Sequence, residues 1–317
     1  MNKIDIIVPI YNAKDSISRL LDSLERQKNS VFLVCIVDDG STDGTASFCE
    51  EIAARYSYPI KVITQENQGP GIARRTGFLQ TDAEYILFCD ADDYLDDHAL
   101  NTICAALEET PVNVLEFGFQ KVTPDGKPIK SKQLKSEYIK TGALEHYLRQ
   151  GNTTNFLWNK VFRRSVIRDT DFQKLFYSED AVALANIFAR TEHYRIIENK
   201  LYNYVISGTS ACGQKYSLKR LDMLKADREI EKIVRRTDET LLPHAAFNTC
   251  VHITKLYVGL SREGLLDPAL KKELKDAFEP NYALVKAEKS VYKGRSFRQK
   301  CAVSLFHRFP AVLGLFG

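Results

Sequence analysis

The chain has 317 residues, of which 44% are hydrophobic and 27% are charged, and its formal net charge is +3 at pH 7. This composition excludes a disordered, collagenous or disulfide-rich chain, and the net charge is too small to indicate nucleic acid as a partner. The charge is uneven, because residues 1–215 carry a net charge of −4 and residues 216–317 a net charge of +7. We therefore expect two regions, 1–215 and 216–317, with different roles.

The first 110 residues alternate between strand and helix patterns. Apolar runs at 4–10, 31–37 and 85–89 predict buried strands, the first of them covered on both faces, and residues 60–64 predict a further strand. Apolar residues at helical spacing separate these runs; one predicted helix begins near Gly71 and ends near Leu79. The alternation predicts an α/β fold with a doubly wound, mostly parallel sheet.

The pattern changes after residue 93. Residues 114–119 read as a further strand, and the turn residues of 123–128 predict a hairpin tip. Beyond residue 216, apolar residues at helical spacing lie among many charges. We therefore expect a helical, basic C-terminal extension after the α/β domain.

The cysteines and the apolar runs bear on the compartment. The seven cysteines form no CxxC pair, and Cys35 and Cys89 fall in predicted strands, which is typical of reduced thiols packed in a core. The N-terminus does not resemble a signal peptide, and no apolar run approaches the ~20 residues of a membrane span. We expect a cytoplasmic protein, either soluble or held peripherally at the inner face of the membrane.

Polar residues gather where each of the four predicted strands ends. In open α/β sheets, ligands bind outside the carboxyl ends of the strands, so these segments mark a candidate site. The four segments are Tyr11-Asn12, Asp38-Asp39-Gly40-Ser41, Glu66-Asn67-Gln68-Gly69 and Asp90-Ala91-Asp92-Asp93.

The last segment contains two carboxylates one residue apart, Asp90 and Asp92. Such a pair repels itself unless a positive charge compensates, and a divalent cation bridging to a diphosphate does so. Ligands that are all oxygen atoms favour Mg²⁺ or Mn²⁺. The alternative is a solvated acidic turn or helix cap.

Two other segments suggest ligand contacts. Asp39 can accept hydrogen bonds from a base N–H or ribose hydroxyls, while 41–43 can cap the following helix, and we expect both. In 69–75, the glycines would let the backbone approach a ligand, and Arg74 near a helix start favours phosphate. A surface arginine is the alternative for Arg74 and Arg75. Neither a P-loop nor a dinucleotide fingerprint is present in the sequence.

A carboxylate pair, Glu179-Asp180, precedes a predicted helix at 181–188. Partial burial could raise the pKa of such a group until it serves as a general base. The alternative is a charge placed there because it stabilises the helix N-terminus.

Taken in order, these segments resemble the family 2 glycosyltransferases, which have the GT-A fold. The resemblance covers about residues 3–215, and the ordered set is specific although each motif is modest. The matching segments are Ile7-Val8-Pro9-Ile10-Tyr11-Asn12, Val37–Thr45, Asn67-Gln68-Gly69 with Ala73-Arg74, Phe88–Asp93, Trp158-Asn159-Lys160, Ser178-Glu179-Asp180, and Leu201–Tyr204 with Ser207–Ser210.

The resemblance implies an inverting transfer from a nucleotide-diphosphate sugar, by default a UDP-sugar, assisted by Mn²⁺ or Mg²⁺. It implies that Asp180 is the catalytic base, that Glu179 shapes the acceptor site and that Asp92 is the direct metal ligand, together with Asp90. Asp39 would bind the base. The remaining donor-binding residues that it implies are Pro9, Tyr11, Asn12, Asn67, Gly69, Arg74, Asp90 and Ala91. Arg75 departs from the family, in which many members have asparagine.

The resemblance also suggests a role in surface polysaccharide synthesis, with a glycan or lipid-linked sugar as acceptor. Seven basic residues and one acidic residue lie in 286–308, with Phe297, Phe306 and the neighbouring Phe309 among them. This segment suggests contact with an anionic membrane, and the alternative is a terminal helix with a solvated basic side. Two other functions stay open: a nucleotidyltransferase, or a degenerate GT-A module that binds nucleotide-sugar without catalysis.

Overall fold

The computed structural model describes residues 3–27, 31–129, 133–206, 215–308 and 310. The chain forms two compact units, and each unit consists of several separate stretches. The first unit comprises Met1–Ala143, Asn155–Lys174 and Arg190–Ser210. The second comprises Leu144–Thr154, Leu175–Ala189 and Ala211–Gly317. The division is therefore not a single cut near residue 215, because two earlier stretches also belong to the helical unit.

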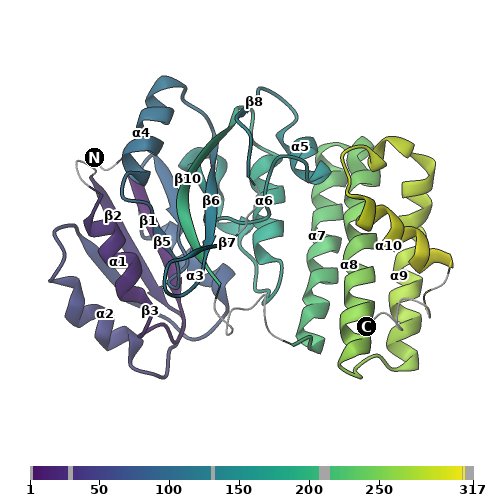
Figure 1. Cartoon of the computed structure of the whole chain (residues 1–317), viewed down its shortest axis with the longest axis horizontal. Coiled ribbons are helices and arrows are strands. Elements are labelled where there is room, and N and C mark those ends of the chain that lie inside the picture. The colour runs from purple at the N-terminus through teal and green to yellow at the C-terminus, as the bar shows by residue number, and fades with distance from the viewer. Residues whose placement is uncertain (1–2, 28–30, 130–132, 207–214, 309, 311–317) are drawn as a thin grey trace. The chain divides into compact units, whose positions relative to one another are not determined.

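The first unit is built on a sheet that has ten strands within the described residues. Four neighbouring strands are parallel, as predicted, and form one half of the sheet (Figure 1). The order along the main path is β3 (Ile60–Thr64), β2 (Phe32–Asp38), β1 (Ile4–Ile10), β4 (Tyr85–Phe88), β9 (Lys160–Arg163), β6 (Val114–Val122), β10 (Tyr194–Val205) and β5 (Tyr94–Leu95), with β7 (Pro128–Ile129) beside β6 and β8 (Glu137–Ile139) beside β10.

Helices cover both faces of the parallel half. The strands β1, β2 and β4 are largely buried, as predicted, whereas the residues of the edge strand β3 are half-buried or exposed. Alternate residues of β1, from Ile4 to Ile10, share a core with apolar residues of α1, α2 and α4. On the other face Ile7 lies against Gly77 of α3, where a Cβ atom would come within 2.4 Å of the Ile7 Cγ2 atom. These helices are α1 (Ile17–Glu25), α2 (Thr45–Ala53), α3 (Pro70–Leu79) and α4 (Ala99–Glu109).

The second half of the sheet is mixed. β9 is antiparallel to both of its neighbours, and β10 is parallel to β6. The pairing of β10 shifts register between Ile197 and Lys200, where the approach of Glu198 leaves no room for a Cβ atom at Gly118 of β6. The predicted hairpin is confirmed, because β7 returns along the end of β6 after the turn at 123–127.

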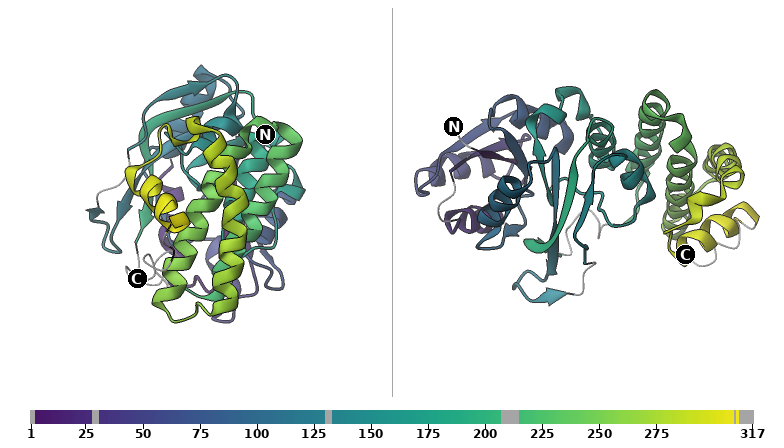
Figure 2. Two further views of the ribbon diagram at one scale, coloured as in Figure 1. Left: turned by 90° about the vertical axis from the view of Figure 1, so that its right-hand side faces the viewer. Right: turned by 90° about the horizontal axis from the view of Figure 1, so that it is seen from above.

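The second unit is helical, as predicted for the residues beyond 216. Figure 2 shows α8 and α9 side by side, with α10 packed against both, and α7 lies along α8. Phe247, Phe278 and Phe306 are buried in their shared core. The helices are α5 (Ala143–Arg149), α6 (Glu179–Phe188), α7 (Asp222–Thr237), α8 (Leu242–Arg262), α9 (Pro268–Ala287) and α10 (Phe297–Arg308).

Short 3₁₀ helices complete the secondary structure, at Arg164–Val166, Asp169–Asp171, Leu218–Leu221, Glu239–Leu241 and Lys289–Tyr292. Within the described part of the chain, no helix combines the length and the apolar character that a membrane crossing requires.

Candidate active site at the carboxyl ends of the parallel strands

Hydrogen bonds join the ends of β1 and β2. The backbone N–H of Asn12 donates to Ser41 Oγ at 2.8 Å, and the N–H of Thr42 donates to Asn12 Oδ1 at 2.9 Å. Asn12 adopts a left-handed conformation with φ of 50°, which asparagine tolerates better than most residues. Pro9 is half-buried near the end of β1, and Tyr11 exposes 53% of its surface. The predicted nucleotide-pocket residues therefore form a defined turn with an exposed aromatic ring.

Asp39 joins the end of β2 to the loop that follows β3. Its carboxylate accepts hydrogen bonds from Gln65 Nε2 at 2.7 Å, Gln68 N at 2.9 Å and Gly69 N at 2.7 Å. Asp39 is 3% exposed, so these bonds replace most of its hydration. The structure therefore brings Asp39 together with Gly69 and its loop neighbour Asn67, and shows a role in holding this loop that the sequence did not indicate.

The capping expectation for 41–43 holds in part. Asp43 Oδ1 accepts from the N–H of Thr45 at 3.0 Å, as expected at the start of α2. Ser41 does not cap this helix, because its hydroxyl donates to the carboxylate of Asp38. The residue in the N-cap position is Gly44, with φ of 84°.

The glycine in the first turn of α3, Gly71, packs against protein. A Cβ atom at Gly71 would lie 2.4 Å from the carbonyl oxygen of Gln173, so this glycine permits a close approach of two backbone segments. The sequence suggested that this glycine makes room for a ligand, but the structure shows that it makes room for the backbone of Gln173. Arg75 is also tied to protein, since its Nη2 lies 3.0 Å from Asp169 Oδ2.

Arg74 is buried and lies against the acidic segment after β4. The residue is 4% exposed, and its Nη2 atom donates to Asp90 Oδ1 at 3.2 Å. The Asp90 side chain keeps 31% of its surface exposed, and Ala91 beside it is buried. An arginine held in this way presents positive charge beside the two carboxylates, where a diphosphate would need it.

Three contacts from distant parts of the first unit hold the Asp90–Asp93 segment. Tyr202 accepts a hydrogen bond from the N–H of Asp90 at 3.0 Å, and Arg19 Nη2 donates to the carbonyl oxygen of Asp92 at 2.7 Å. Asp93 Oδ1 accepts from the N–H of Val205 at 2.8 Å. Desolvation by burial raises the pKa of Asp92 and, more strongly, of Asp93.

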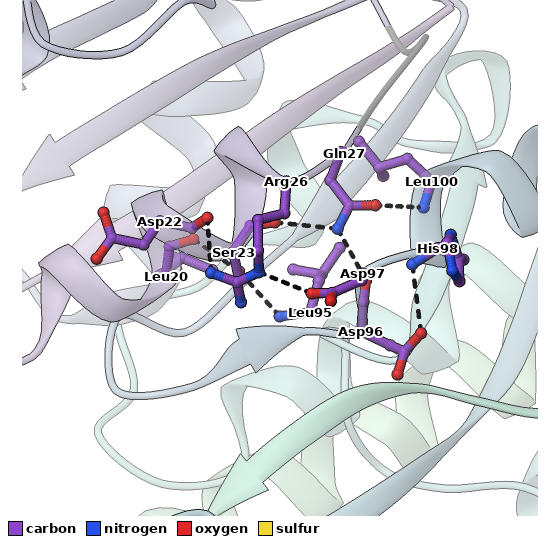
Figure 3. Close-up of polar contacts among 10 residues, drawn as sticks. All are labelled: Leu20, Asp22, Ser23, Arg26, Gln27, Leu95, Asp96, Asp97, His98 and Leu100. Atoms are coloured by element: carbon purple, nitrogen blue, oxygen red, sulfur yellow. Dashed lines mark hydrogen bonds and ion pairs between the residues drawn. The ribbon is translucent and has the colours of Figure 1, made fainter.

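Helix α1 and the turn after it hold the chain that follows this segment (Figure 3). Ser23 Oγ accepts from the N–H of Leu95 at 3.1 Å. Gln27 donates to the carbonyl oxygen of Asp96 at 2.8 Å and accepts from the N–H of Leu100 at 3.0 Å. Arg19 and Ser23 are four residues apart and lie on one face of α1, and Gln27 follows in the turn after the helix.

The strand β10 and an aromatic stack behind the acidic segment were not predicted from the sequence. Trp158 stacks on Tyr202 and Tyr204 with ring centroids 4.6 and 5.3 Å apart. Lys160, in the same short segment, is fully buried with its Nζ 3.3 Å from Glu116 Oε1. The only sequence signal was the motif Trp158-Asn159-Lys160 and the aromatic pair 202 and 204, which the structure places in the core.

Asp90 and Asp92 suit a hard divalent cation that takes its other ligands from a substrate and from water. Among the residues that the structure describes, no group of three or more acidic, histidine or cysteine side chains could hold a metal ion. Asp90 and Asp92 supply two carboxylates, and Mg²⁺ is commonly bound by one or two carboxylates together with phosphate oxygens and water. The donor set therefore fits a cation that arrives with a diphosphate rather than one caged by protein alone.

Glu179 and Asp180 belong to the second unit and lie in the first turn of α6. This helix begins two residues earlier than predicted, after Ser178, which has a left-handed φ of 65°. Such a conformation is costly for a non-glycine residue, and strained residues of this kind cluster at functional sites. Both carboxylates are half-buried, and Tyr147 fixes the same turn by donating to the carbonyl oxygen of Ala181.

Comparisons with known proteins identify the family of this chain. The chain is 26% identical over 262 residues to the uncharacterized glycosyltransferase YibD of Escherichia coli, which covers 78% of this chain and 75% of YibD. It is 28% identical to the putative glycosyltransferase EpsH of Bacillus subtilis over 77% of this chain and 75% of EpsH.

A third relative, the poly(ribitol-phosphate) β-N-acetylglucosaminyltransferase TarS of Staphylococcus aureus, is 27% identical over 64% of this chain, which spans 35% of TarS. A crystal structure of S. aureus TarS matches 98% of this chain and 54% of the TarS chain with a TM-score of 0.68 and 20% identity. The TarS fragment 1–349 in complex with UDP-GlcNAc matches 93% of both chains with a TM-score of 0.60 and 21% identity.

These structural matches confirm the predicted α/β fold of the GT-A type. The sequence model described as glycosyl transferase family 2 matches residues 5–171, which include every strand end of the candidate site. Because that match covers more than half of the chain, the protein belongs to glycosyl transferase family 2.

Proposed function

We propose that this protein is an inverting glycosyltransferase that moves a sugar from a UDP-sugar to a hydroxyl group of a glycan or lipid-linked acceptor. The proposal is carried by the hydrogen-bonded edge where Asp39 follows β2 and Asp90 follows β4, with Arg74 of α3 paired to Asp90. One relative supports the choice of donor: TarS is named as an N-acetylglucosaminyltransferase, and its fragment 1–349 has been solved with UDP-GlcNAc.

Each residue of this edge has a distinct task in the proposal. Asp39 makes three hydrogen bonds to protein, and a carboxylate has about four acceptor positions, so one is available for a base N–H. The exposed ring of Tyr11 offers a stacking surface for the base. Arg74 compensates negative charge that grows on the departing diphosphate.

Asp90 and Asp92 would hold Mg²⁺ or Mn²⁺, which supplies further positive charge at the diphosphate when bound. Asp180 accepts the proton of the acceptor hydroxyl as its oxygen attacks the anomeric carbon. The bond from that carbon to the diphosphate oxygen breaks, and its electron pair leaves with the nucleoside diphosphate. One displacement inverts the configuration, so no covalent sugar–enzyme intermediate is required. Glu179 borders the acceptor.

The test measures nucleoside diphosphate release from a panel of UDP-, GDP- and dTDP-sugars, each with Mn²⁺, Mg²⁺ or EDTA, while calorimetry on the same samples measures donor binding. We expect one UDP-sugar to bind in a metal-dependent way and to be turned over once an acceptor glycan is added. Asp180→Asn should retain binding and lose turnover, and Glu108→Gln, an exposed carboxylate on α4, serves as the matched control.

The outcomes separate the three functions. Metal-dependent binding with turnover in the wild type and none in Asp180→Asn supports the transferase. Release of inorganic diphosphate from a nucleoside triphosphate would assign a nucleotidyltransferase. Binding without turnover on any acceptor of a glycan array would assign a module that binds nucleotide-sugar without catalysis.

We also propose that the C-terminal region contacts an anionic membrane that presents the acceptor. Lys286, Lys289 and Lys293 are exposed, and Phe297 exposes 80% of its surface. Arg295 does not share this surface, because it is 6% exposed and donates to the carbonyl oxygen of Leu148. Phe309, also expected there, lies outside the described residues.

The membrane contact is tested by substitution, since truncation at Tyr292 would remove the buried Val303 and Phe306. Cosedimentation with vesicles of phosphatidylglycerol should fall when Lys289, Lys293 and Phe297 are replaced by serine. In the control, Lys271, Lys272 and Lys275 of α9 are replaced by serine, which removes three positive charges where the first variant removes two. Unchanged sedimentation of the first variant would contradict the proposal.

A further inference from the structure

A cavity of about 360 Å³ lies wholly within the second unit, against α8 and the start of α10. This volume falls within the range of small-molecule sites. Its floor is apolar and includes Val251, Val258 and Ala302. Its basic residues are Lys255, Arg262 and Arg298, and no aspartate or glutamate is among the described residues that line it.

One wall of the cavity depends on a glycine. A Cβ atom at Gly259 would lie 2.2 Å from a ring carbon of Tyr216, so the ring rests directly on the backbone of α8. Lys255, Gly259 and Arg262 follow one another at intervals of four and three residues, which places them on the same face of that helix. The helix therefore presents an aromatic wall with a cation on either side of it.

The three cations favour an anionic group. Arginine matches the oxygen atoms of a phosphate with paired N–H donors, and Arg262 and Arg298 supply two such groups. Lys255 keeps its side chain exposed, yet partial desolvation lowers its pKa, while the charge of Asp227 acts in the opposite direction. A partly desolvated ammonium is stabilised in its charged form by a nearby anion.

We propose that this cavity binds an amphipathic anion, namely a single hydrocarbon chain that carries a phosphate head. The chain lies on the apolar floor, and the phosphate lies among Lys255, Arg262 and Arg298. The ligand is taken up as a monomer, because a pocket of about 360 Å³ has room for a single small molecule. This site lies within the second unit alone and does not depend on the proposed transfer reaction.

The test is calorimetry on the full chain with decyl phosphate, held below its micelle concentration. Inorganic phosphate and 1-decanol, titrated separately, each carry one half of the ligand. We expect saturable binding of decyl phosphate that is at least tenfold tighter than that of either half. Equal binding of 1-decanol would overturn the role of the cations, and equal binding of inorganic phosphate would overturn the role of the floor.

Substitutions locate the binding. Lys255→Ala with Arg298→Ala should weaken decyl phosphate binding at least tenfold, and Ala302→Phe should block it by filling the cavity. The control pair, Lys271→Ala with Lys275→Ala, removes the same charge from exposed positions of α9. Thermal unfolding verifies that each variant is folded. Equal weakening by the control pair would show a general charge effect and overturn the site.

A vesicle arm separates the cavity from a membrane surface. In this arm the wild type and Ala302→Phe are mixed with phosphatidic acid vesicles. The proposal would be overturned if both proteins bind the vesicles equally and neither binds monomeric decyl phosphate. That result would assign these cations to a lipid surface.

Discussion

The hydroxyl of Tyr202 accepts a hydrogen bond from the backbone N–H of Asp90 across a sequence separation of 112 residues. Tyr202 is fully buried, and three residues later the N–H of Val205 donates to Asp93. Strand β10 therefore fixes both ends of the acidic segment that we propose as the metal and diphosphate site. The geometry of that segment depends on a strand far from it in sequence.

We expect Tyr202→Phe to loosen the acidic segment without emptying the aromatic stack. The ring still packs on Trp158, but the buried N–H of Asp90 loses its acceptor, which costs about 1–3 kcal/mol in the free energy of unfolding. Urea denaturation measures this loss. Metal-dependent donor binding should weaken in parallel, because Asp90 is less firmly placed.

The control is Tyr138→Phe, a tyrosine of β8 that is 42% exposed. A Tyr202→Phe variant with wild-type metal dependence and wild-type stability would show that the hydrogen bond does not position Asp90.

The hydrogen bonds of Gln27, in the turn after α1, should also contribute to the stability of the first unit. Gln27→Leu removes the acceptor for the N–H of Leu100 and the donor to Asp96, both close to the start of α4 (Figure 3). We expect a loss of about 2 kcal/mol or more, since each buried group left without a partner costs roughly 1–3 kcal/mol. Hydrogen exchange at Leu100 reports the loss directly, and Ser18→Ala on α1 is the comparison.

Removing Lys160 alone from its buried pair with Glu116 should lower stability more than removing both charges. Lys160→Met leaves the Glu116 carboxylate in the core with Asn159 and Tyr194 as hydrogen-bond partners and without the ammonium group of Lys160. We expect a loss of about 3–5 kcal/mol in the free energy of unfolding. Adding Glu116→Gln removes the buried charge and should recover part of this loss. Lys61→Met, at an exposed lysine of β3, is the control, and an effect of similar size there would contradict the prediction.

Much of the α/β half could be predicted because its signals are local. The apolar run of β1 is nearly continuous and those of β2 and β4 are unbroken up to their last residues, and the residues after these strands form the strand-end network. Strand β10 escaped prediction because Glu198, Asn199 and Lys200 interrupt it at a bulge. The pairing of Arg74 with Asp90 could not be read from the chain either, since it arises only when α3 and the end of β4 come together.

The second unit predicts a pH dependence of stability that arises at His244. This residue is 4% exposed; desolvation, and then the charges of Arg149 and Arg295, lower its pKa below the ordinary value of 6.5. The folded state therefore favours neutral imidazole. Its contribution to stability is present above pH 6.5 and is lost as the pH falls through the lowered pKa.

Urea denaturation at pH 7 and pH 5 tests this dependence. His244→Gln should lose less stability than the wild type between these pH values, because glutamine does not take up a proton. His98→Gln, at an exposed histidine, should follow the wild type. An identical loss in all three proteins would contradict the prediction.

The interleaving of the two units has a consequence for synthesis. The segments Leu144–Thr154 and Leu175–Ala189 leave the ribosome before α7 and α8, with which they form one unit. The side chain of Asn186 in α6, for example, bonds Arg236 of α7, which emerges later. Synthesis adds ~5–20 residues per second, so several seconds pass between the synthesis of Glu179 and Asp180 and that of the helices that complete their unit. During that interval a stalled or prematurely ended chain has the donor edge but an incomplete unit around its proposed base, so unfinished chains would not transfer sugar.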